Sequence, residues 1–350
     1  MKLTQIAGAH SLGRYVQIIK KMDLEKIEQY PTKVEVLKSI DRLKKKKFPK
    51  YKDGDDVSKF VDKVSSILLD EFSFMLNPKQ PINTNDFLSK FFRVREIDSF
   101  TNIDLIREHS YPPIENVKMG RCNFPKFPVF YCSNNPLTAL LEVAKSLQDS
   151  EKEYCISKWE IIPMNENMIF EHFLQIDLPK ENEFSKIKDG IQKKISSPFI
   201  ISFNKKLSKD QENGLIEYLK YLDSSFINDN DYSLSATLAH RALYVDHNYR
   251  TDVLMYPSVQ TVFKGTNLAI QPNFVENNMK LTRLYVLSFD KYDPLSGKID
   301  LTFKKYGIVE KNIIKWKNIS PNDSFYTQLI KEDFNTSMDG KYIELKNNLP

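Results

Sequence analysis

The chain has 350 residues, with 51 Lys and Arg against 46 Asp and Glu, which gives a net charge of +5. So small a surplus argues against a dedicated nucleic-acid-binding protein. A hydrophobic content of 41% with 12% aromatic residues excludes wholesale disorder. The length suits one large domain or two ordinary ones, either of which can bury a full core without disulfides.

The sequence predicts a cytoplasmic protein without a membrane partner. No apolar run approaches the roughly 18 residues of a membrane span. His10, Arg14 and several lysines fall where a signal peptide is apolar. The three cysteines form no CxxC pair, which is typical of free thiols in a reducing compartment. The five histidines form no HExxH motif and no Cys/His grid, so we expect no metal site.

The first part of the chain, residues 1–76, is predicted to be helical. Pro31 suits a first turn and is followed by apolar residues at helical spacing, Val34, Leu37 and Ile40. A second apolar stripe runs from Val57 to Met75. Such a stripe must be covered, and we expect this region to serve regulation or oligomerisation. The turn-rich residues 77–87 are predicted to be a linker.

Beyond the linker the apolar pattern changes from a helical period to a period of two. Phe92-Arg93-Val94-Arg95 alternates apolar and basic side chains, so both arginines lie on one face of a predicted strand. Asn135 and Pro136 are typical of an N-cap and a first turn, which predicts a helix directly after a strand at 127–131. The remaining predicted elements are strands near 284–289 and 299–303, an insertion at about 164–230 with a helix near 211–222, and a polar C-terminal extension, 311–350.

Several short motifs of this second part occur in an informative order. They are Phe92-Arg93-Val94, Gly120-Arg121, Phe130-Tyr131, Pro136-Leu137-Thr138-Ala139-Leu140-Leu141-Glu142, Tyr256-Pro257-Ser258 and Asn267-Leu268-Ala269. Together they resemble the RES domain, the toxin half of bacterial RES–Xre toxin–antitoxin pairs, which is named for an Arg, a Glu and a Ser. The resemblance covers roughly residues 88–280, apart from the insertion, and does not include the helical N-terminus.

This resemblance implies an α+β fold over residues 88–310, with an ADP-ribosyltransferase-like, mixed and mostly antiparallel β core, preceded here by the helical region. It implies an NAD+-degrading toxin or effector of a toxin–antitoxin or phage-defence system. NAD+ is then the substrate, and no bound cofactor is implied. The implied partner is a cognate antitoxin or regulatory protein. Whether water, phosphate or a macromolecule accepts the ADP-ribose stays open.

The resemblance also assigns catalytic residues. Cleavage of the nicotinamide–ribose bond develops an oxocarbenium-like cation, which a carboxylate stabilises. Glu142 is expected in this role. Tyr131 is expected to stack on nicotinamide or to hydrogen-bond the ribose. Ser258 is expected to supply a hydroxyl for the carboxamide or the sugar. Arg121 completes the catalytic set.

The substrate's phosphates need a different kind of group. The one GxxxxG, Gly8–Gly13, is followed by Arg14 rather than by the lysine of a phosphate-binding loop. Arg93 and Arg121 are expected on the pyrophosphate instead, because a guanidinium binds oxyanions bidentately without a glycine loop. With Tyr131 and Ser258, Asn267 is expected to contact NAD+ as well.

Two other functions stay open. Arg241 and His247 have the Arg-x5-His spacing of HEPN ribonucleases, in which both residues help to cleave RNA. The chain would otherwise be a non-catalytic sensor or scaffold whose N-terminal helices bind a partner. Nicotinamide release, RNA cleavage or neither distinguishes the three.

Overall fold

The computed structural model describes residues 30–75, 79–87, 90–144, 152–182, 184–185, 207–244, 250–293, 298–320, 323–334 and 342–344. They form an α+β protein built on one 11-stranded sheet, in the order β1-β5-β6-β7-β3-β2-β4-β8-β9-β10, with β11 paired to β9. Only β5 and β6 are paired in parallel among the described strands. The expected α+β class with a mixed, mostly antiparallel sheet is therefore confirmed.

The helices and strands have the following bounds. The α-helices are α2 (Lys33–Lys45), α3 (Val57–Phe72), α4 (Pro136–Val143), α6 (Lys209–Ile227), α7 (Ser233–Leu243), α8 (Pro272–Asn278) and α9 (Ser324–Phe334). The strands are β1 (Lys79–Asn83), β2 (Phe91–Glu96), β3 (Phe130–Ser133), β4 (Glu153–Ile161), β5 (Asn167–His172), β6 (Val253–Pro257), β7 (Thr266–Ile270), β8 (Met279–Asp293), β9 (Lys298–Glu310), β10 (Ile313–Asn318) and β11 (Tyr342–Glu344). Three short 3-10 helices, η2 (Ile97–Ser99), η3 (Ile106–His109) and η4 (Ile114–Asn116), follow β2.

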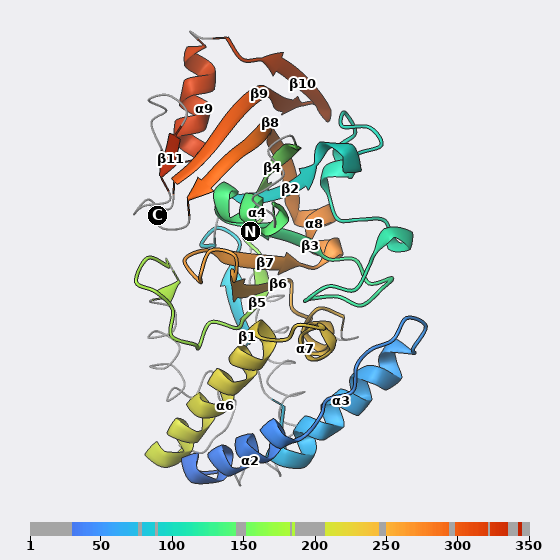
Figure 1. Cartoon of the computed structure of the whole chain (residues 1–350), viewed down its shortest axis with the longest axis vertical. Coiled ribbons are helices and arrows are strands. Elements are labelled where there is room, and N and C mark those ends of the chain that lie inside the picture. The colour runs from blue at the N-terminus through green and yellow to red at the C-terminus, as the bar shows by residue number, and fades with distance from the viewer. Residues whose placement is uncertain are drawn as a thin grey trace, which may run out of the picture.

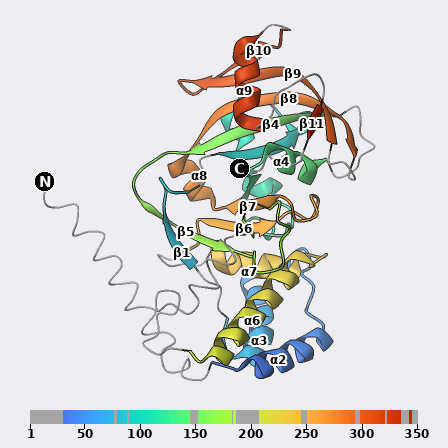
Figure 2. The ribbon, with the colours of Figure 1, turned by 90° about the vertical axis from the view of Figure 1, so that its left-hand side faces the viewer.

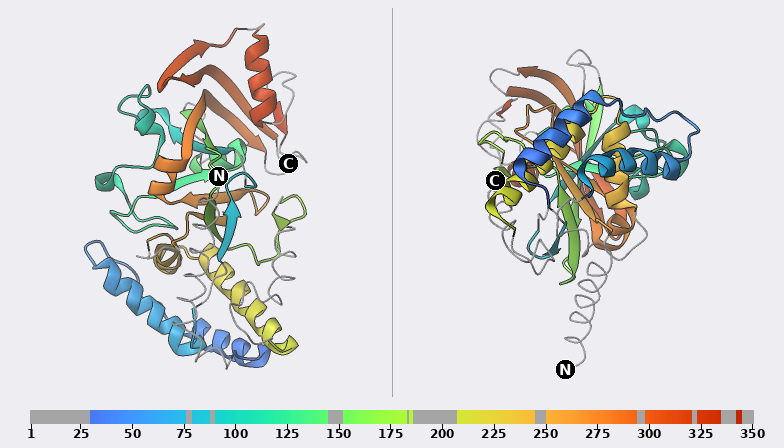
Figure 3. Two further views of the ribbon diagram at one scale, coloured as in Figure 1. Left: turned by 180° about the vertical axis from the view of Figure 1, so that it is seen from behind. Right: turned by 90° about the horizontal axis from the view of Figure 1, so that it is seen from below.

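The helices gather at opposite ends of the sheet. α2, α3, α6 and α7 lie at one end, and α9 lies at the other beside β9 and β10 (Figure 1). The side view shows the same division, with α4 between the two ends (Figure 2). Seen from below, α2, α3 and α6 lie across their end of the sheet (Figure 3).

The sheet has a narrow joint at its centre. β2 and β3 are paired at a single position, Phe92 opposite Ser133, whereas β2 pairs with β4 along its whole length. The sheet is thereby divided into a part with β1, β5, β6, β7 and β3 and a part with β2, β4, β8, β9 and β10. α4 follows β3 directly and packs against β2, so it lies at this joint.

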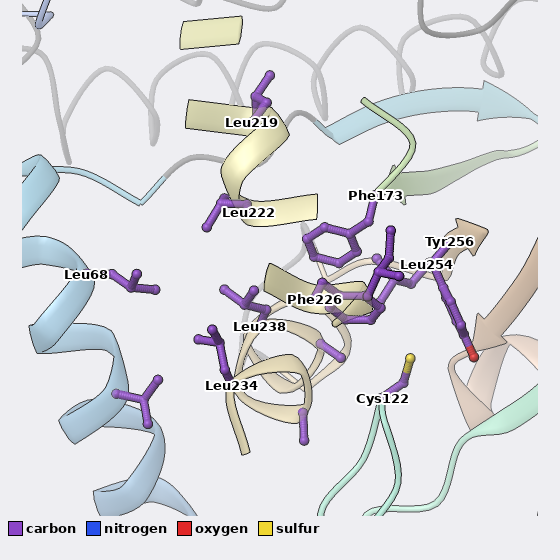
Figure 4. Packing of buried hydrophobic residues seen from close by; sticks show 14 of the residues in the cluster. Leu68, Cys122, Phe173, Leu219, Leu222, Phe226, Leu234, Leu238, Leu254 and Tyr256 are labelled. Carbon is purple, nitrogen blue, oxygen red and sulfur yellow. The ribbon is translucent and has the colours of Figure 1, made fainter. Parts of the chain in front are cut away.

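The N-terminal helices share their core with the rest of the protein. The stripe of α3 is buried at Phe60, Val61, Val64, Leu68 and Phe72, as its spacing predicted. These side chains belong to one cluster with residues of α6, α7 and the central strands, part of which Figure 4 shows. The stripe is therefore covered within the chain and does not by itself require a second protein.

The buried face of α2 differs from the predicted one. Val34 and Leu37 are 58% and 39% exposed, while Val36, Ile40 and Leu43 are buried. The sequence offers two overlapping stripes, and only the one spaced i, i+4 and i+7 continues along the whole helix. This stripe faces α6 and α3.

Two predicted boundaries also differ from the structure. The residues expected to form a linker contain β1, which pairs with β5 at the edge of the sheet. β5 itself lies within the expected insertion and pairs with β6, so this part of the insertion belongs to the sheet. β1 escapes a sequence pattern because it is short, polar and contains Pro81, which strands tolerate at an edge. The predicted C-terminal extension likewise adds β10, α9 and β11 to the structure.

Candidate functional site

Two distant parts of the chain meet at the carboxylate of Glu142. Ser258 Oγ donates a hydrogen bond of 2.5 Å to Glu142 Oε1, and Asn267 Nδ2 donates one of 2.7 Å to the same oxygen. Ser258 and Asn267 are buried, and Glu142 is half-buried. These three residues, here called the Glu142 cluster, are separated by 116 and 125 positions along the chain.

The other oxygen of this carboxylate is left open. Oε2 accepts no hydrogen bond from any residue that the structure describes, and it is not sealed off in the interior. One oxygen thus fixes the orientation of the carboxylate, while the second can meet a ligand.

Local sequence places Glu142 on α4. Asn135 is the N-cap, and its Oδ1 accepts from the backbone N–H groups of Leu137 at 2.9 Å and Thr138 at 3.1 Å. Pro136 follows at the first turn, as predicted. The helix therefore begins at a defined residue, and Glu142 lies almost two turns further on.

The β6–β7 hairpin supplies both donors. Tyr256 pairs with Asn267 across the two strands, and Ser258 follows β6 directly. The turn is closed by backbone bonds from Ser258 N to Gly265 O (2.9 Å) and from Phe263 N to Ser258 O (2.8 Å). A Cβ on Gly265 would lie 2.2 Å from Thr138 Oγ1, so glycine lets the hairpin approach α4 this closely.

Two tyrosines lie on the same face of the sheet. Pairing across β3, β7 and β6 puts Tyr131 and Tyr256 on the face that carries Asn267. Tyr131 Oη accepts from Cys122 N at 2.7 Å and donates to Asn123 Oδ1 at 2.8 Å. Burial raises the pKa of both hydroxyls well above the ordinary value, and for Tyr256 the negative charge of Glu142 adds to the effect. Both tyrosines are therefore neutral near pH 7.

Tyr256 was not among the predicted site residues, although it belongs to one of the quoted motifs. Figure 4 shows it beside Cys122 and against the ring of Phe226. The pairing of Tyr256 with Asn267 has no local sequence signal, because the connection from Ser258 to Gly265 is longer than the tight turns that fix the register of a hairpin.

Arg121 is held by the end of a helix. Its Nη1 donates to the carbonyl oxygen of Ile227 at 2.8 Å and also to that of Phe226, both in the last turn of α6. Its guanidinium lies 5.2 Å from the centre of the Tyr232 ring. The Phe226 ring lies 6.0 Å from this guanidinium and 5.4 Å from the Tyr256 ring, so Arg121 lies on the face of the sheet that carries Tyr256.

The structure does not bring Arg93 to the Glu142 cluster. Phe92 pairs with Ser133, which pairs with Asn267, so Arg93 as the next residue projects from the opposite face of the sheet. There its guanidinium lies 5.5 Å from the centre of the Phe130 ring, and Nη1 donates to Tyr131 O at 3.0 Å. Burial and the nearby Arg95 lower its pKa to about 10. The two arginines assigned to one pyrophosphate are thus on different faces.

Of Arg241 and His247, the two residues expected of a HEPN ribonuclease, the structure describes only Arg241. Arg241 is an exposed residue of α7 whose Nη1 donates to Ser65 Oγ at 3.2 Å. His247 lies outside the described residues, so the expected approach of Arg241 and His247 stays a prediction.

The described part of the chain shows buried thiols and no group of metal ligands. Cys122, Cys132 and Cys155 are free and buried, as expected, and burial raises the pKa of the Cys122 thiol to about 12. Within the described ranges no three His, Cys, Asp or Glu side chains are grouped as metal ligands. Among the helices that the structure describes, none is both long and apolar enough to cross a bilayer.

Comparison with known proteins gave no relative. No protein-family model matches the chain, and no curated protein and no solved structure matches it either.

Proposed function

We propose that the protein is an NAD+-degrading enzyme of the RES-domain type that cleaves the nicotinamide–ribose bond. The observation that carries this proposal is the Glu142 carboxylate, with Oε1 fixed by Ser258 and Asn267 and Oε2 open. The motifs that resemble the RES domain supply all three residues. The hairpin that carries Ser258 and Asn267 and the helix that carries Glu142 thus bring residues of three separate motifs to one carboxylate.

The geometry suits the chemistry. The breaking C–N bond leaves its electron pair on nicotinamide and a positive charge on the ribose. A carboxylate oxygen already oriented by two donors stabilises that charge without reorganising. An acceptor then forms the new bond to the ribose carbon, and water, phosphate or a macromolecule can serve. The neutral ring of Tyr131 or Tyr256 offers a stacking surface for nicotinamide or a hydroxyl for the ribose.

Arg121 is the residue proposed for the pyrophosphate. Its guanidinium keeps N–H donors beyond those used on α6. Arg93 would need a separate role or an anion on the other face of the sheet. In this proposal the β core is of the ADP-ribosyltransferase type.

We place this activity in a toxin–antitoxin or phage-defence system of the cytoplasm, with an antitoxin or regulatory protein as the partner. Expression without the partner should then arrest growth while cellular NAD+ falls, and Glu142→Gln should permit growth at equal protein level. NAD+ pools and RNA integrity are measured together after induction. Arrest with intact NAD+ and fragmented RNA would favour the ribonuclease, and no arrest with intact NAD+ and RNA would favour a non-catalytic sensor.

A further inference from the structure

We propose that Tyr232 is a positioning residue that holds the Arg121 guanidinium against the end of α6, so that its free edge is presented to an anionic group of the substrate. The substrate class is a molecule with a phosphate or diphosphate. The catalytic consequence rests on the proposed function, but the positioning itself can be measured without it.

The contacts of Arg121 leave part of its fork unused. Nη1 is engaged by the carbonyl oxygens of Phe226 and Ile227, which are unpaired at a helix C-terminus and carry its partial negative charge. Nε and Nη2 donate to no residue that the structure describes. The helix end thus fixes one edge of the planar group and leaves the other edge for an oxyanion.

Tyr232 covers the guanidinium at a cost to its own backbone. It has φ +62° and ψ 5°, the left-handed conformation that glycine and asparagine adopt more readily than an aromatic residue. Its ring lies 5.2 Å from the guanidinium carbon, within the range of a cation–π interaction. A residue retained in an unfavourable conformation suggests that its side chain has a use.

Capping of α7 does not explain this residue. Tyr232 occupies the N-cap position, where a side-chain oxygen normally accepts from the first turn, and it makes no such bond. Asp231 Oδ1 accepts from Ser233 N at 3.1 Å, and Asp229 Oδ2 accepts from Ser235 N at 2.7 Å. The cap is provided by these neighbours, and the ring over Arg121 is what Tyr232 adds.

The loop between α2 and α3 contacts the residues that connect α6 to α7, next to Tyr232. Tyr51 N donates to Ser233 Oγ at 2.9 Å, and Lys50 Nζ lies 3.1 Å from Asp231 Oδ2. The Tyr51 ring also packs at 4.9 Å from the ring of Phe124, close in sequence to Arg121. The N-terminal helical region thereby supports the segment that carries Tyr232.

Removal of the ring should weaken substrate capture and spare turnover. The anion carries the same charge in the ground state and in the transition state, so a lost orientation of Arg121 acts on KM rather than on kcat. Tyr232→Gly should raise the KM for NAD+ about tenfold, the size of a partly desolvated cation–π contact. Because glycine accepts φ +62° easily, relief of the backbone offsets part of the lost ring contact, and this variant should stay folded.

The matched variants are Tyr232→Phe, which keeps the ring, and Ser73→Gly. Ser73 caps the C-terminus of α3 with φ 60° and ψ 4°, nearly the same backbone, and is exposed. Each variant is compared by thermal unfolding, by steady-state kinetics with NAD+, and by the side-chain Nε–H NMR signal of Arg121 in arginine-labelled protein, assigned with Arg121→Lys.

The proposal expects the Arg121 Nε–H signal to report a mobile side chain in Tyr232→Gly alone. Tyr232→Phe and Ser73→Gly should resemble the wild type in KM and in the NMR signal. An unchanged Arg121 signal, or an unchanged KM, in folded Tyr232→Gly would overturn it. A wild-type protein that releases no nicotinamide would remove the proposed function, whereas the NMR comparison would still decide whether Tyr232 positions Arg121.

Discussion

At the scale of single residues, the site is defined by the Glu142 carboxylate, to which Ser258 and Asn267 both donate hydrogen bonds. Two buried donors meet on Oε1 of Glu142, and both come from the β6–β7 hairpin. A buried hydroxyl and a buried amide are costly without partners. Glu142 therefore satisfies the hairpin as much as the hairpin orients Glu142, and a conservative change at this position should keep the fold.

Glu142→Gln tests this division directly. Its amide oxygen can still accept from Ser258 and Asn267, but the negative charge opposite the developing cation is gone. We expect kcat to fall by two to three decades, or roughly 3–4 kcal/mol, with KM within a few-fold of the wild type. Arg121→Lys should do the reverse, with KM raised about tenfold and kcat little changed, because lysine lacks the planar fork. Equal losses of kcat in both variants would contradict the separate roles.

The sequence assigned Glu142, Ser258 and Asn267 to one site but did not predict that they contact one another. The motif order named Ser258 and Asn267 as substrate-binding residues, whereas the structure shows them bound to the carboxylate itself. For Arg93 the sequence established the alternation of β2, but the face shared with Phe92 depends on pairing with β3. No sequence pattern identifies Tyr232, because its contact with Arg121 arises only when the segment that carries Arg121 packs against the end of α6 and the connection to α7.

At the scale of elements, α3 belongs to the core next to the site. Leu68 is fully buried in the cluster that contains Tyr256 and Cys122, whereas its neighbour Leu69 is 41% exposed. Leu68→Ala should therefore lower the free energy of unfolding by about 2–5 kcal/mol, and Leu69→Ala by less than about 1 kcal/mol. Urea unfolding measures both. Similar small losses in the two variants would mean that α3 is only loosely attached, as a separate regulatory region would be.

The second element-scale prediction concerns α9. Its Asp333 is buried and lies 2.9 Å from Lys158 Nζ and 3.1 Å from Arg283 Nη1, and it accepts from Tyr285 Oη at 2.6 Å. Asp333→Ala leaves Lys158 buried with Glu160 alone, so we expect a loss of about 3–5 kcal/mol. The control is Glu332→Gln, which breaks a more exposed pair with Arg283 and should cost less than about 1 kcal/mol. Stability is compared by urea unfolding, and an Asp333→Ala protein as stable as the control would contradict the network.

Elements with strong periodicity were predictable and short polar ones were not. The stripe of α3 and the Asn135–Pro136 start of α4 were read correctly, because spacing and capping are local. The stretch that contains β1 is predicted to be a linker, because an edge strand with polar residues leaves no alternation to detect. β5 is internal to the sheet, and its place there depends on its pairing with β1 and β6. Local sequence patterns identify elements that bury one face, and they miss strands that are defined only by pairing with another strand.

At the scale of the whole molecule, the class could be predicted and the strand order could not. The change from a helical period to a period of two indicated helices followed by strands, and the resemblance to the RES domain implied the α+β class. The order in which β5, β6 and β7 join β3 depends on pairings between residues far apart in sequence, which no local pattern encodes. The single β2–β3 pairing, which sets the position of α4, is of this kind.

Three histidines make the stability of the whole protein dependent on pH. Burial lowers the pKa of His109, His172 and His240 to about 4, from 6.5 in an unfolded chain. The unfolded state therefore binds protons first as the pH falls. Their contribution is fully present above pH 6.5 and is lost towards pH 4, with a slope of up to about 4 kcal/mol per pH unit if all three act.

Urea unfolding at pH 7.5, 6.0 and 5.0 measures this slope. His172→Asn should keep an acceptor for Leu174 N, which donates to His172 Nδ1, and should reduce the slope by about a third. A His172→Asn protein with the same slope as the wild type would contradict the burial of a neutral His172.

The most direct test of the central claim is nicotinamide release from NAD+ by the purified full-length protein, followed by chromatography together with the ADP-ribosyl product. The account predicts equal amounts of nicotinamide and of ADP-ribose or its phosphorylated or protein-linked form. It predicts a rate two to three decades lower for Glu142→Gln and a rate within a few-fold of the wild type for Arg241→Ala. Release that is unaffected by Glu142→Gln, or no release from a folded wild-type protein that cleaves RNA, would contradict it.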